Sequence, residues 1–202
     1  LRQGEELSEE ERRLWRACDE MGTPPANEWL PVPGRSIHLG KPASDRTYGW
    51  DNEYGTEEVS LPDFQAGRRL VSNAEFLAFI AAGGYRDESF WTDEGKGWLQ
   101  YTKAVHPRFW VDRGGEYLQR NLLEEIPLPL DWPVEVNCLE AQAYCRWLAR
   151  ETGENVLLPT EAHWHALRAD AVAATAGSLE FDQPTWQRAP GNINLERFAS
   201  SC

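Results

Sequence analysis

The sequence predicts an α+β fold built from short strands, a few short helices and long ordered loops. Helix-capping signatures precede apolar residues at helical spacing, whereas the strand-like stretches are short and interrupted by proline or glycine. The 202 residues include 10 tryptophans and 7 phenylalanines, large rings that supply core area but need close packing and partners for indole N–H groups. This composition fits a compact, loop-rich domain with one sizeable core better than a helical bundle.

The first predicted element is an amphipathic helix over about residues 9–21. A capping box formed by Ser8 and Glu11 precedes it. Its apolar stripe consists of Leu14, Trp15, Cys18 and Met21. A glycine and two prolines follow it and prevent it from continuing. We therefore separate residues 1–28, a helix and linker, from residues 29–202, the main domain.

Two strands are predicted early in the main domain. Apolar residues sit among proline and glycine from Val32 to Leu39, which indicates a short strand with turns. A second strand is predicted over about residues 59–64. Because proline cannot donate to a strand ladder, Pro62 places this second strand at a sheet edge or beside a bulge.

A capping box of Ser72 and Glu75 predicts the start of a helix. One face of this helix carries Phe76, Phe79 and Ile80. The pair Gly83–Gly84 ends it. From Tyr85 to Leu130 no helical or strand period is sustained, although aromatic side chains are frequent. We expect this stretch to be a long ordered loop that is functional or packed by its own side chains.

Two further helices are predicted in the last third of the chain. Asn137 and Glu140 repeat the capping pattern. The buried face of that helix carries Leu139, Ala143, Trp147 and Leu148. Thr160 caps the last helix. The apolar residues of this helix include Trp164 and Leu167, three positions apart. Residues 171–177 are rich in alanine and are expected to form a loop.

The charge balance argues against nucleic-acid binding. Twenty Lys and Arg against 33 Asp and Glu give a formal net charge of −13 and an isoelectric point near 4.8, the wrong sign for a nucleic acid or an anionic membrane surface. No apolar run approaches the roughly 20 residues that span a bilayer. Four scattered cysteines are too few for a disulfide framework. We therefore expect a reduced, cytoplasmic protein with neither a nucleic-acid nor a membrane partner.

Four stretches of the chain carry a resemblance to a known family. They are Tyr48–Gly55 (YGWDNEYG), Val71–Phe79 (VSNAEFLAF), Trp132–Ala141 (WPVEVNCLEA) and Leu158–Ala162 (LPTEA). Their order and spacing resemble the formylglycine-generating-enzyme-like, or sulfatase-modifying-factor, domain from about Trp29 to the end of the chain. Within that family the chain is similar to the ovothiol-type 5-histidylcysteine sulfoxide synthases, with the ergothioneine sulfoxide synthases as the nearest relatives of that group.

This resemblance implies a fold and a reaction. The fold would be the formylglycine-generating-enzyme variant of the C-type-lectin-like fold, incomplete at its C-terminus because the family's Gly-Asn-Val-Trp-Glu-Trp-like motif does not occur in the chain. The complete enzyme would join cysteine to the imidazole of histidine with iron(II) and dioxygen. A preceding DinB-like four-helix domain, of which residues 1–28 would be the tail, would hold the iron through a His-x3-His-x-Glu-type motif. The chain would then form the substrate side of the site without ligating the metal.

The histidines of the chain do not indicate a metal site. An iron centre of this kind needs three converging histidine or carboxylate ligands. His163 and His165 would point to nearly opposite sides of one helix. The remaining histidines are His38 and His106, which stand alone. We therefore assign no metal ligand to this chain.

The cysteines do not indicate a redox pair either. Cys138 and Cys145 lie seven positions apart on one predicted helix, which separates their Cα atoms by roughly 10 Å. That distance exceeds the reach of a disulfide. We interpret Cys138 as a small residue of the core.

Two groups of residues are candidates for binding an amino-acid substrate. Trp50, Asp51 and Asn52 could pair with its ammonium and carboxylate groups. Alternatively, they form a turn in which the two polar side chains bond backbone N–H groups beside a packed indole. In the long loop, Arg108 could hold a carboxylate and Trp110 could cover an imidazole. Alternatively, the aromatic residues of that loop fill the core.

Two other functions remain compatible with the sequence. The C-type-lectin-like fold also supports non-catalytic binding modules, because a fold alone does not fix a function. A formylglycine-generating oxidase of sulfatases is the third possibility. It would need a reactive cysteine pair that Cys138 and Cys145 do not supply.

Overall fold

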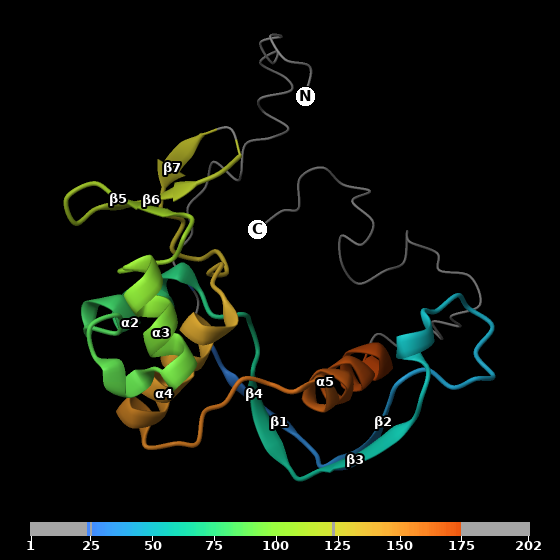
Figure 1. Ribbon diagram of the computed structural model, residues 1–202. Coiled ribbons are helices and arrows are strands. Elements are labelled where there is room, and N and C mark those ends of the chain that lie inside the picture. The colour runs from blue at the N-terminus through green and yellow to red at the C-terminus, as the bar shows by residue number, and fades with distance from the viewer. Residues whose placement is uncertain (1–23, 25, 123, 175–202) are drawn as a thin grey trace, which may run out of the picture.

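The structure, a computed structural model, describes residues 24, 26–122 and 124–174. Within them the chain forms helices and small antiparallel sheets in two regions (Figure 1). The helices are α2 (Asn73–Ala81), α3 (Asp93–Thr102), α4 (Cys138–Thr152) and α5 (Glu161–Ala174). Helices α2, α3 and α4 pack together, whereas α5 lies against strands of the other region. The α+β class is confirmed, and the helix predicted over residues 9–21 lies outside the described residues.

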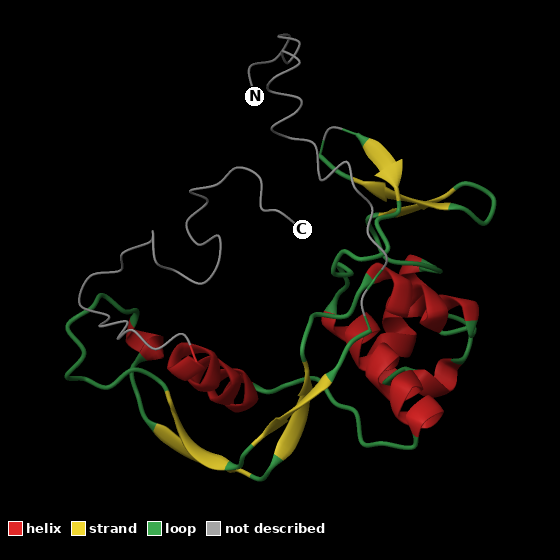
Figure 2. Ribbon diagram, turned by 180° about the vertical axis from the view of Figure 1, so that it is seen from behind, coloured by secondary structure: helices red, strands yellow, loops and turns green. Residues whose placement is uncertain are grey.

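The first four strands form one long, bent hairpin (Figure 2). They are β1 (Trp29–Val32), β2 (Arg35–Leu39), β3 (Glu57–Leu61) and β4 (Phe64–Gly67). Strand β1 pairs antiparallel with β4, and β2 pairs antiparallel with β3. At the bend, the Gly34 N–H donates to Asp63 Oδ1 at 2.7 Å, and a Cβ on Gly34 would lie 2.7 Å from Leu61 O. The interruption predicted at Pro62 is confirmed, because it falls between β3 and β4. The single strand predicted from Val32 to Leu39 is instead divided between β1 and β2.

Helices α2 and α4 begin as their capping boxes predict. Ser72 Oγ accepts the Glu75 N–H at 3.3 Å, and Glu75 Oε2 accepts the Ser72 N–H at 2.7 Å. Asn137 Oδ1 accepts the Glu140 N–H at 3.0 Å, and Glu140 Oε2 accepts the Asn137 N–H at 2.9 Å. Gly153 ends α4 in the left-handed region, with φ 73°.

The stretch from Tyr85 to Leu130 contains regular structure that the sequence pattern does not reveal. Thr92 caps α3, and its hydroxyl accepts the Gly95 N–H at 3.0 Å. Three strands follow in the sheet order β5–β6–β7. They are β5 (Trp110–Asp112), β6 (Tyr117–Arg120) and β7 (Glu125–Pro127). The expectation of a continuous loop is therefore wrong. Two glycines interrupt the apolar period of α3, and strands this short show no alternation.

Helix α5 differs from its prediction in length and in buried face. Thr160 Oγ1 accepts the His163 N–H at 3.4 Å, as the predicted cap requires. A small apolar cluster beneath the helix buries Val32, Ile37, Ala162 and Ala166. Trp164, by contrast, is 54% exposed. Because the helix runs to Ala174, the loop expected from Ala171 onward is wrong for these last helical residues.

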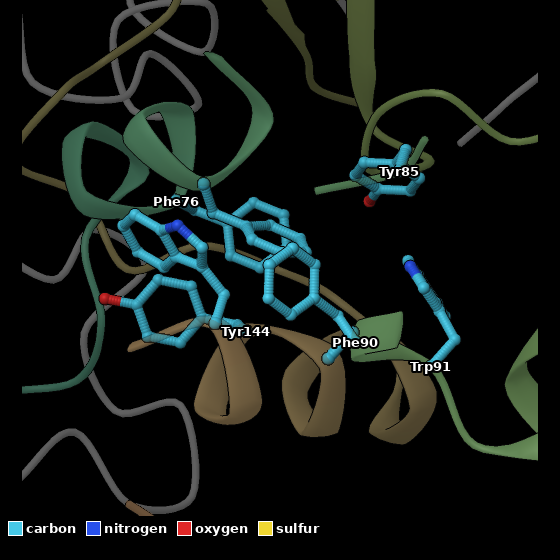
Figure 3. Close-up of a cluster of buried hydrophobic side chains, with 8 residues drawn as sticks. Phe76, Tyr85, Phe90, Trp91 and Tyr144 are labelled. Atoms are coloured by element: carbon cyan, nitrogen blue, oxygen red, sulfur yellow. The ribbon is translucent and has the colours of Figure 1, made fainter. Parts of the chain in front are cut away.

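The larger core is an aromatic cluster between α2, α4 and the 3-10 turn η2 (Glu88–Phe90). It buries Phe76, Phe79, Tyr85, Phe90, Trp91, Ala143, Tyr144 and Trp147 (Figure 3). Phe76 stacks on Tyr144 with ring centroids 5.5 Å apart. A Cβ on Gly84 would lie within 2.5 Å of the Phe79 ring, so glycine is required there. The described chain thus buries two apolar clusters where the sequence predicted one core. No helix in it is long and apolar enough to cross a bilayer.

Candidate functional site

An exposed turn holds the predicted polar cluster. The turn, η1 (Asp51–Glu53), lies beyond β2 and β3, on the opposite side of the molecule from β5–β7 (Figure 1). Lys41 anchors the loop that leads to it. The Lys41 N–H donates to Glu53 O at 3.0 Å, and its ammonium donates to Thr47 Oγ1 at 2.6 Å and to Tyr48 O at 2.7 Å. One lysine therefore ties both ends of the loop together.

Some side chains of the turn bond its backbone, whereas others are exposed to solvent. Glu53 Oε2 accepts the Trp50 N–H at 2.9 Å, and Asp51 Oδ1 accepts the Asn52 N–H at 3.0 Å. The indole of Trp50 is 64% exposed. The turn interpretation is thus correct for Asp51, but Trp50 is not packed as that interpretation requires. Trp50, Asp51 and Asn52 lie together and face solvent.

Three exposed aromatic rings belong to this loop. Tyr48 and Trp50 meet edge to face, with centroids 5.9 Å apart. Lys41 Nζ lies 5.8 Å from the centroid of the Tyr54 ring. The exposed fractions of the two tyrosines are 79% and 41%. A surface of rings beside a carboxylate and an amide suits a ligand that carries a ring or a cationic nitrogen.

The second candidate pair is not brought to this turn. Arg108 precedes β5 and is exposed, with its guanidinium 6.0 Å from the Phe109 ring. Trp110 begins β5 and is 2% exposed. It packs against Phe76 and Tyr117 at centroid distances of 6.4 and 5.2 Å. The structure therefore places Trp110 in the core and Arg108 at the surface.

A buried acid and a buried phenol form a hydrogen-bonded pair in which both pKa values are raised. Tyr85 Oη donates to Glu140 Oε1 at 2.5 Å, and Glu140 is 3% exposed. Burial raises the pKa of Glu140, while the Tyr85 hydroxyl, the Asn137 N–H and the charge of His106 act in the opposite direction. Burial and the neighbouring carboxylate also raise the pKa of Tyr85. The sequence pattern does not reveal this pair, because the two residues are 55 positions apart.

His163 and His106 make local contacts. His163 Nδ1 lies 2.6 Å from Thr160 Oγ1, and its ring meets Phe64 edge to face at 4.8 Å. His106 Nδ1 lies 3.0 Å from Pro107 O. Among the residues that the structure describes, no group of three or more His, Cys, Asp or Glu is arranged to hold a metal ion. These residues therefore do not fit an iron centre of their own.

The two cysteines of α4 are free thiols in different settings. Cys145 is buried, which raises the pKa of its thiol. Cys138 is exposed in the first turn of the helix, with its Sγ 3.6 Å from Gln142 Nε2. The interpretation of Cys138 as a core residue is therefore wrong. As the first residue of α4, Cys138 lies outside the buried face that Ala143, Tyr144 and Trp147 form further along the helix.

The sequence analysis did not predict the bonds by which Glu53 and Lys41 shape the exposed turn. Glu53 follows Trp50 by three positions, the spacing of a capping box, so a local signal for its bond to the Trp50 N–H was available. Lys41 has no such signal. Its bonds to Thr47, Tyr48 and Glu53 exist only once the loop has closed.

The sequence matches the family described as the sulfatase-modifying factor enzyme 1-like domain over residues 18–198. It is also similar to three proteins named hercynine oxygenase. The one from Mycolicibacterium thermoresistibile is 37% identical over 127 residues, which are 62% of this chain and 26% of that protein. The one from Mycolicibacterium smegmatis is 37% identical over 134 residues, 66% of this chain and 29% of that protein.

The third, from Mycobacterium tuberculosis, is 35% identical over 127 residues, 62% of this chain and 28% of that protein. The matched stretch therefore spans between a quarter and a third of the length of these curated relatives.

Proposed function

Because this chain belongs to the sulfatase-modifying factor enzyme 1-like domain family, we propose that it is the substrate-side domain of an iron(II)- and dioxygen-dependent sulfoxide synthase. The observation that carries the proposal is the identity of 35–37% to proteins named hercynine oxygenase. Hercynine is the trimethylated betaine of histidine, so that name favours an imidazole substrate and oxygen chemistry for the whole enzyme.

The proposed substrates are cysteine and histidine, joined as 5-histidylcysteine sulfoxide in ovothiol biosynthesis. Two stretches resemble the ovothiol-type enzymes and support this choice. They are Tyr48–Gly55 (YGWDNEYG) and Leu128–Asn137 (LPLDWPVEVN), which overlaps the Trp132–Ala141 stretch named above. The name of the relatives favours hercynine instead. The two imidazoles differ only at the α-nitrogen, which is an ammonium in histidine and a quaternary nitrogen in hercynine. Selectivity therefore depends on the groups that meet this nitrogen.

The exposed turn offers groups for the α-nitrogen of the substrate. The Asp51 carboxylate can pair with an ammonium, whereas the ring of Trp50 can also lie over a quaternary nitrogen. Asn52 can donate to the substrate carboxylate through its amide. Arg108 remains the candidate for a second carboxylate, from a separate part of the surface.

The role proposed for this chain is to bind and orient the substrates and to exclude water from the reacting groups. The described residues hold no ligand set for iron. We therefore assign the iron to another part of the same polypeptide, a preceding DinB-like domain. That domain would supply the oxygen chemistry, while the turn around Trp50 would hold the imidazole substrate in reach of it.

Turnover by the intact polypeptide that contains this chain tests the function. With iron(II), dioxygen and cysteine, we expect a cysteinyl-imidazole sulfoxide from histidine, identified by mass spectrometry. A preference for hercynine would place the enzyme in the ergothioneine branch. Absence of product with both imidazoles, from protein shown to contain iron, would refute the function.

The substitution Trp50→Ala tests the site in the same intact enzyme. We expect KM for the imidazole substrate to rise about ten-fold, which corresponds to about 1.4 kcal/mol, with the iron content unchanged. Tyr101→Ala is the control, because this aromatic residue is 90% exposed on α3. An unchanged KM in Trp50→Ala would remove the turn from the substrate site.

The 202-residue chain by itself tests the division of labour. We expect no one-to-one iron by elemental analysis and no sulfoxide from cysteine plus histidine, because the described residues offer no converging ligands. Tight stoichiometric iron in this chain would contradict the assignment of the metal to another domain.

A non-catalytic binding module is the second candidate function. The exposed rings of Tyr48, Trp50 and Tyr54 favour it, since such surfaces also serve recognition without chemistry. The turnover assay separates the two. A formylglycine-generating oxidase finds no support in the described thiols, which are unpaired.

A further inference from the structure

A small cleft lies where the described chain begins. Its volume is about 290 Å³, and its walls come from the residue Asn27 before β1, the connection from β4 to α2, the first turn of α2 and the connection from β7 to α4. The residues that matter for its chemistry are Asn27, Arg69, Leu70, Glu75, Asp131 and Pro133. Leu70 is 74% exposed. The cleft therefore presents an uncovered apolar wall next to two carboxylates and one guanidinium.

The incoming chain is fastened at the rim of this cleft. The Asn27 amide bonds the backbone of Arg69 in both directions, because its Oδ1 accepts the N–H at 3.1 Å and its Nδ2 donates to the carbonyl at 3.1 Å. Arg69 Nη1 donates to Ala26 O at 3.3 Å. Arg68 pairs with Glu28 at 3.0 Å. The direction from which the preceding segment arrives is thus fixed by several bonds.

The preceding segment is short enough to be held near the cleft. Six residues lead from Met21 to Asn27, and a fully extended chain of that length spans about 20 Å. The end of the helix predicted over residues 9–21 is therefore tethered within that distance. An isolated helix of this length is marginal in water, so its apolar stripe requires a surface to pack against.

We propose that residues 9–21 dock on this cleft and cover Leu70. The segment carries matching chemistry, because Leu14 and Trp15 supply apolar area for the uncovered wall. Arg12, Arg13 and Arg16 supply cations. Their partner would be the carboxylate of Glu75 at the rim. Docking would hold whatever precedes the domain in one orientation toward it.

Native Cys18 lies in the docking segment and allows a direct test. In a Cys138→Ser, Cys202→Ser background of the 202-residue chain, Leu70→Cys should form an intramolecular disulfide with Cys18. The measured quantity is the effective concentration of each thiol pair in a glutathione redox buffer. The value for Cys18 with the cysteine of Leu70→Cys should exceed the value for Cys18 with the cysteine of Leu157→Cys at least about ten-fold. Leu157 is the matched control, a leucine that is 72% exposed. Peptide mapping identifies the linked pair.

Three results would overturn the proposal. One is an equal effective concentration toward Cys18 for the cysteines of Leu70→Cys and Leu157→Cys. Another is a disulfide between two chains that grows with protein concentration, because it would assign the cleft to a second copy. The third is an unchanged effective concentration when Trp15→Asp is added, since a merely tethered segment would not need that ring.

Cleavage by trypsin provides a second test that does not depend on the Cys18 thiol. The segment can be cut after Arg12, Arg13 and Arg16, and docking protects these bonds. Leu70→Asp should therefore speed cleavage there, whereas Leu157→Asp should not. Equal cleavage rates in the two variants would count against docking even if the disulfide formed.

Discussion

A buried carboxyl is tolerated in the aromatic core because both of its oxygens are bonded. Glu140 Oε2 accepts the Asn137 N–H as part of a helix cap, and Oε1 accepts the Tyr85 hydroxyl. Burial of a polar group is costly unless such partners are present. The residue therefore has two roles, since it caps α4 and ties that helix to the segment after α2. The raised pKa of Glu140 reports that burial outweighs the bonds that favour its charged form.

Tyr85→Phe should raise the pKa of Glu140 further, because it removes a bond that favours the carboxylate. A folded-state pKa above the ordinary value of 4.5 gives stability that is complete in acid and is lost as the pH rises through the folded value. In Tyr85→Phe the folded-state pKa is higher, so the free energy of unfolding should keep falling up to a higher pH than in the unsubstituted protein. It should be lower at neutral pH by about 1–3 kcal/mol. Carboxyl titration by NMR and urea unfolding measure both effects.

Tyr101→Phe is the control for this substitution, because Tyr101 is 90% exposed. It should change neither quantity. An unaltered pKa for Glu140 in Tyr85→Phe would show that the hydroxyl does not favour the carboxylate.

At the scale of single residues, the features that could be predicted are those set by the spacing of nearby residues in the sequence. The caps at Ser72 and Asn137 follow from residues three positions apart, and both are confirmed. Trp110 lies in the core, which is the alternative that the sequence left open for the aromatic residues of its loop. Local spacing could not decide between the two interpretations, because the burial of Trp110 depends on Phe76 in helix α2. Trp50 shows the reverse case, since its indole is 64% exposed although the turn interpretation expected it to be packed.

At the scale of elements, α3 shows why a helix can be hidden in a sequence. Thr92 caps it and two acidic residues occupy its first turn, signals that favour a helix start. Gly95 and Gly97 lower the helix propensity and interrupt the apolar stripe. The helix forms because Gly95 packs closely on Trp91 and because Trp98 stacks on the same indole at 5.9 Å. Tertiary contact therefore overrides weak local preference.

Gly97→Ala should stabilise the protein by about 0.5–1 kcal/mol, because glycine in a helix interior costs about that much relative to alanine. A Cβ at this position meets no atom within 4 Å. Gly95→Ala is the matched comparison on the same helix. There the added Cβ would lie 3.0 Å from the Trp91 ring, so we expect a smaller gain or a loss. Urea unfolding of both variants measures the difference, and equal gains would contradict the close packing at Gly95.

At the scale of the whole molecule, the class of fold was predictable and the division of its core was not. Capping boxes and short broken strands indicate an α+β domain, and these signals are local. Whether the apolar residues gather in one cluster or two depends on which strands α5 covers. That choice is made by Ala162 and Ala166, two small residues with no strong signal of their own. The exposed turn was found as a motif, but its distance from Arg108 was not foreseen.

The two clusters predict two regions of unequal stability. The cluster under α5 buries four residues, two of them alanines, whereas the aromatic cluster buries eight. Ile37→Ala should cost about 2–4 kcal/mol by leaving a cavity in the smaller cluster. Hydrogen exchange should then show faster opening of β2, β3 and α5 while amides of α4 keep their protection. Phe79→Leu is the complementary variant, because Phe79 is fully buried in the aromatic cluster, and it should loosen α2 and α4 first. If Ile37→Ala lowered protection equally in α4 and α5, the two regions would unfold as a single unit and the division of the core would have no energetic meaning.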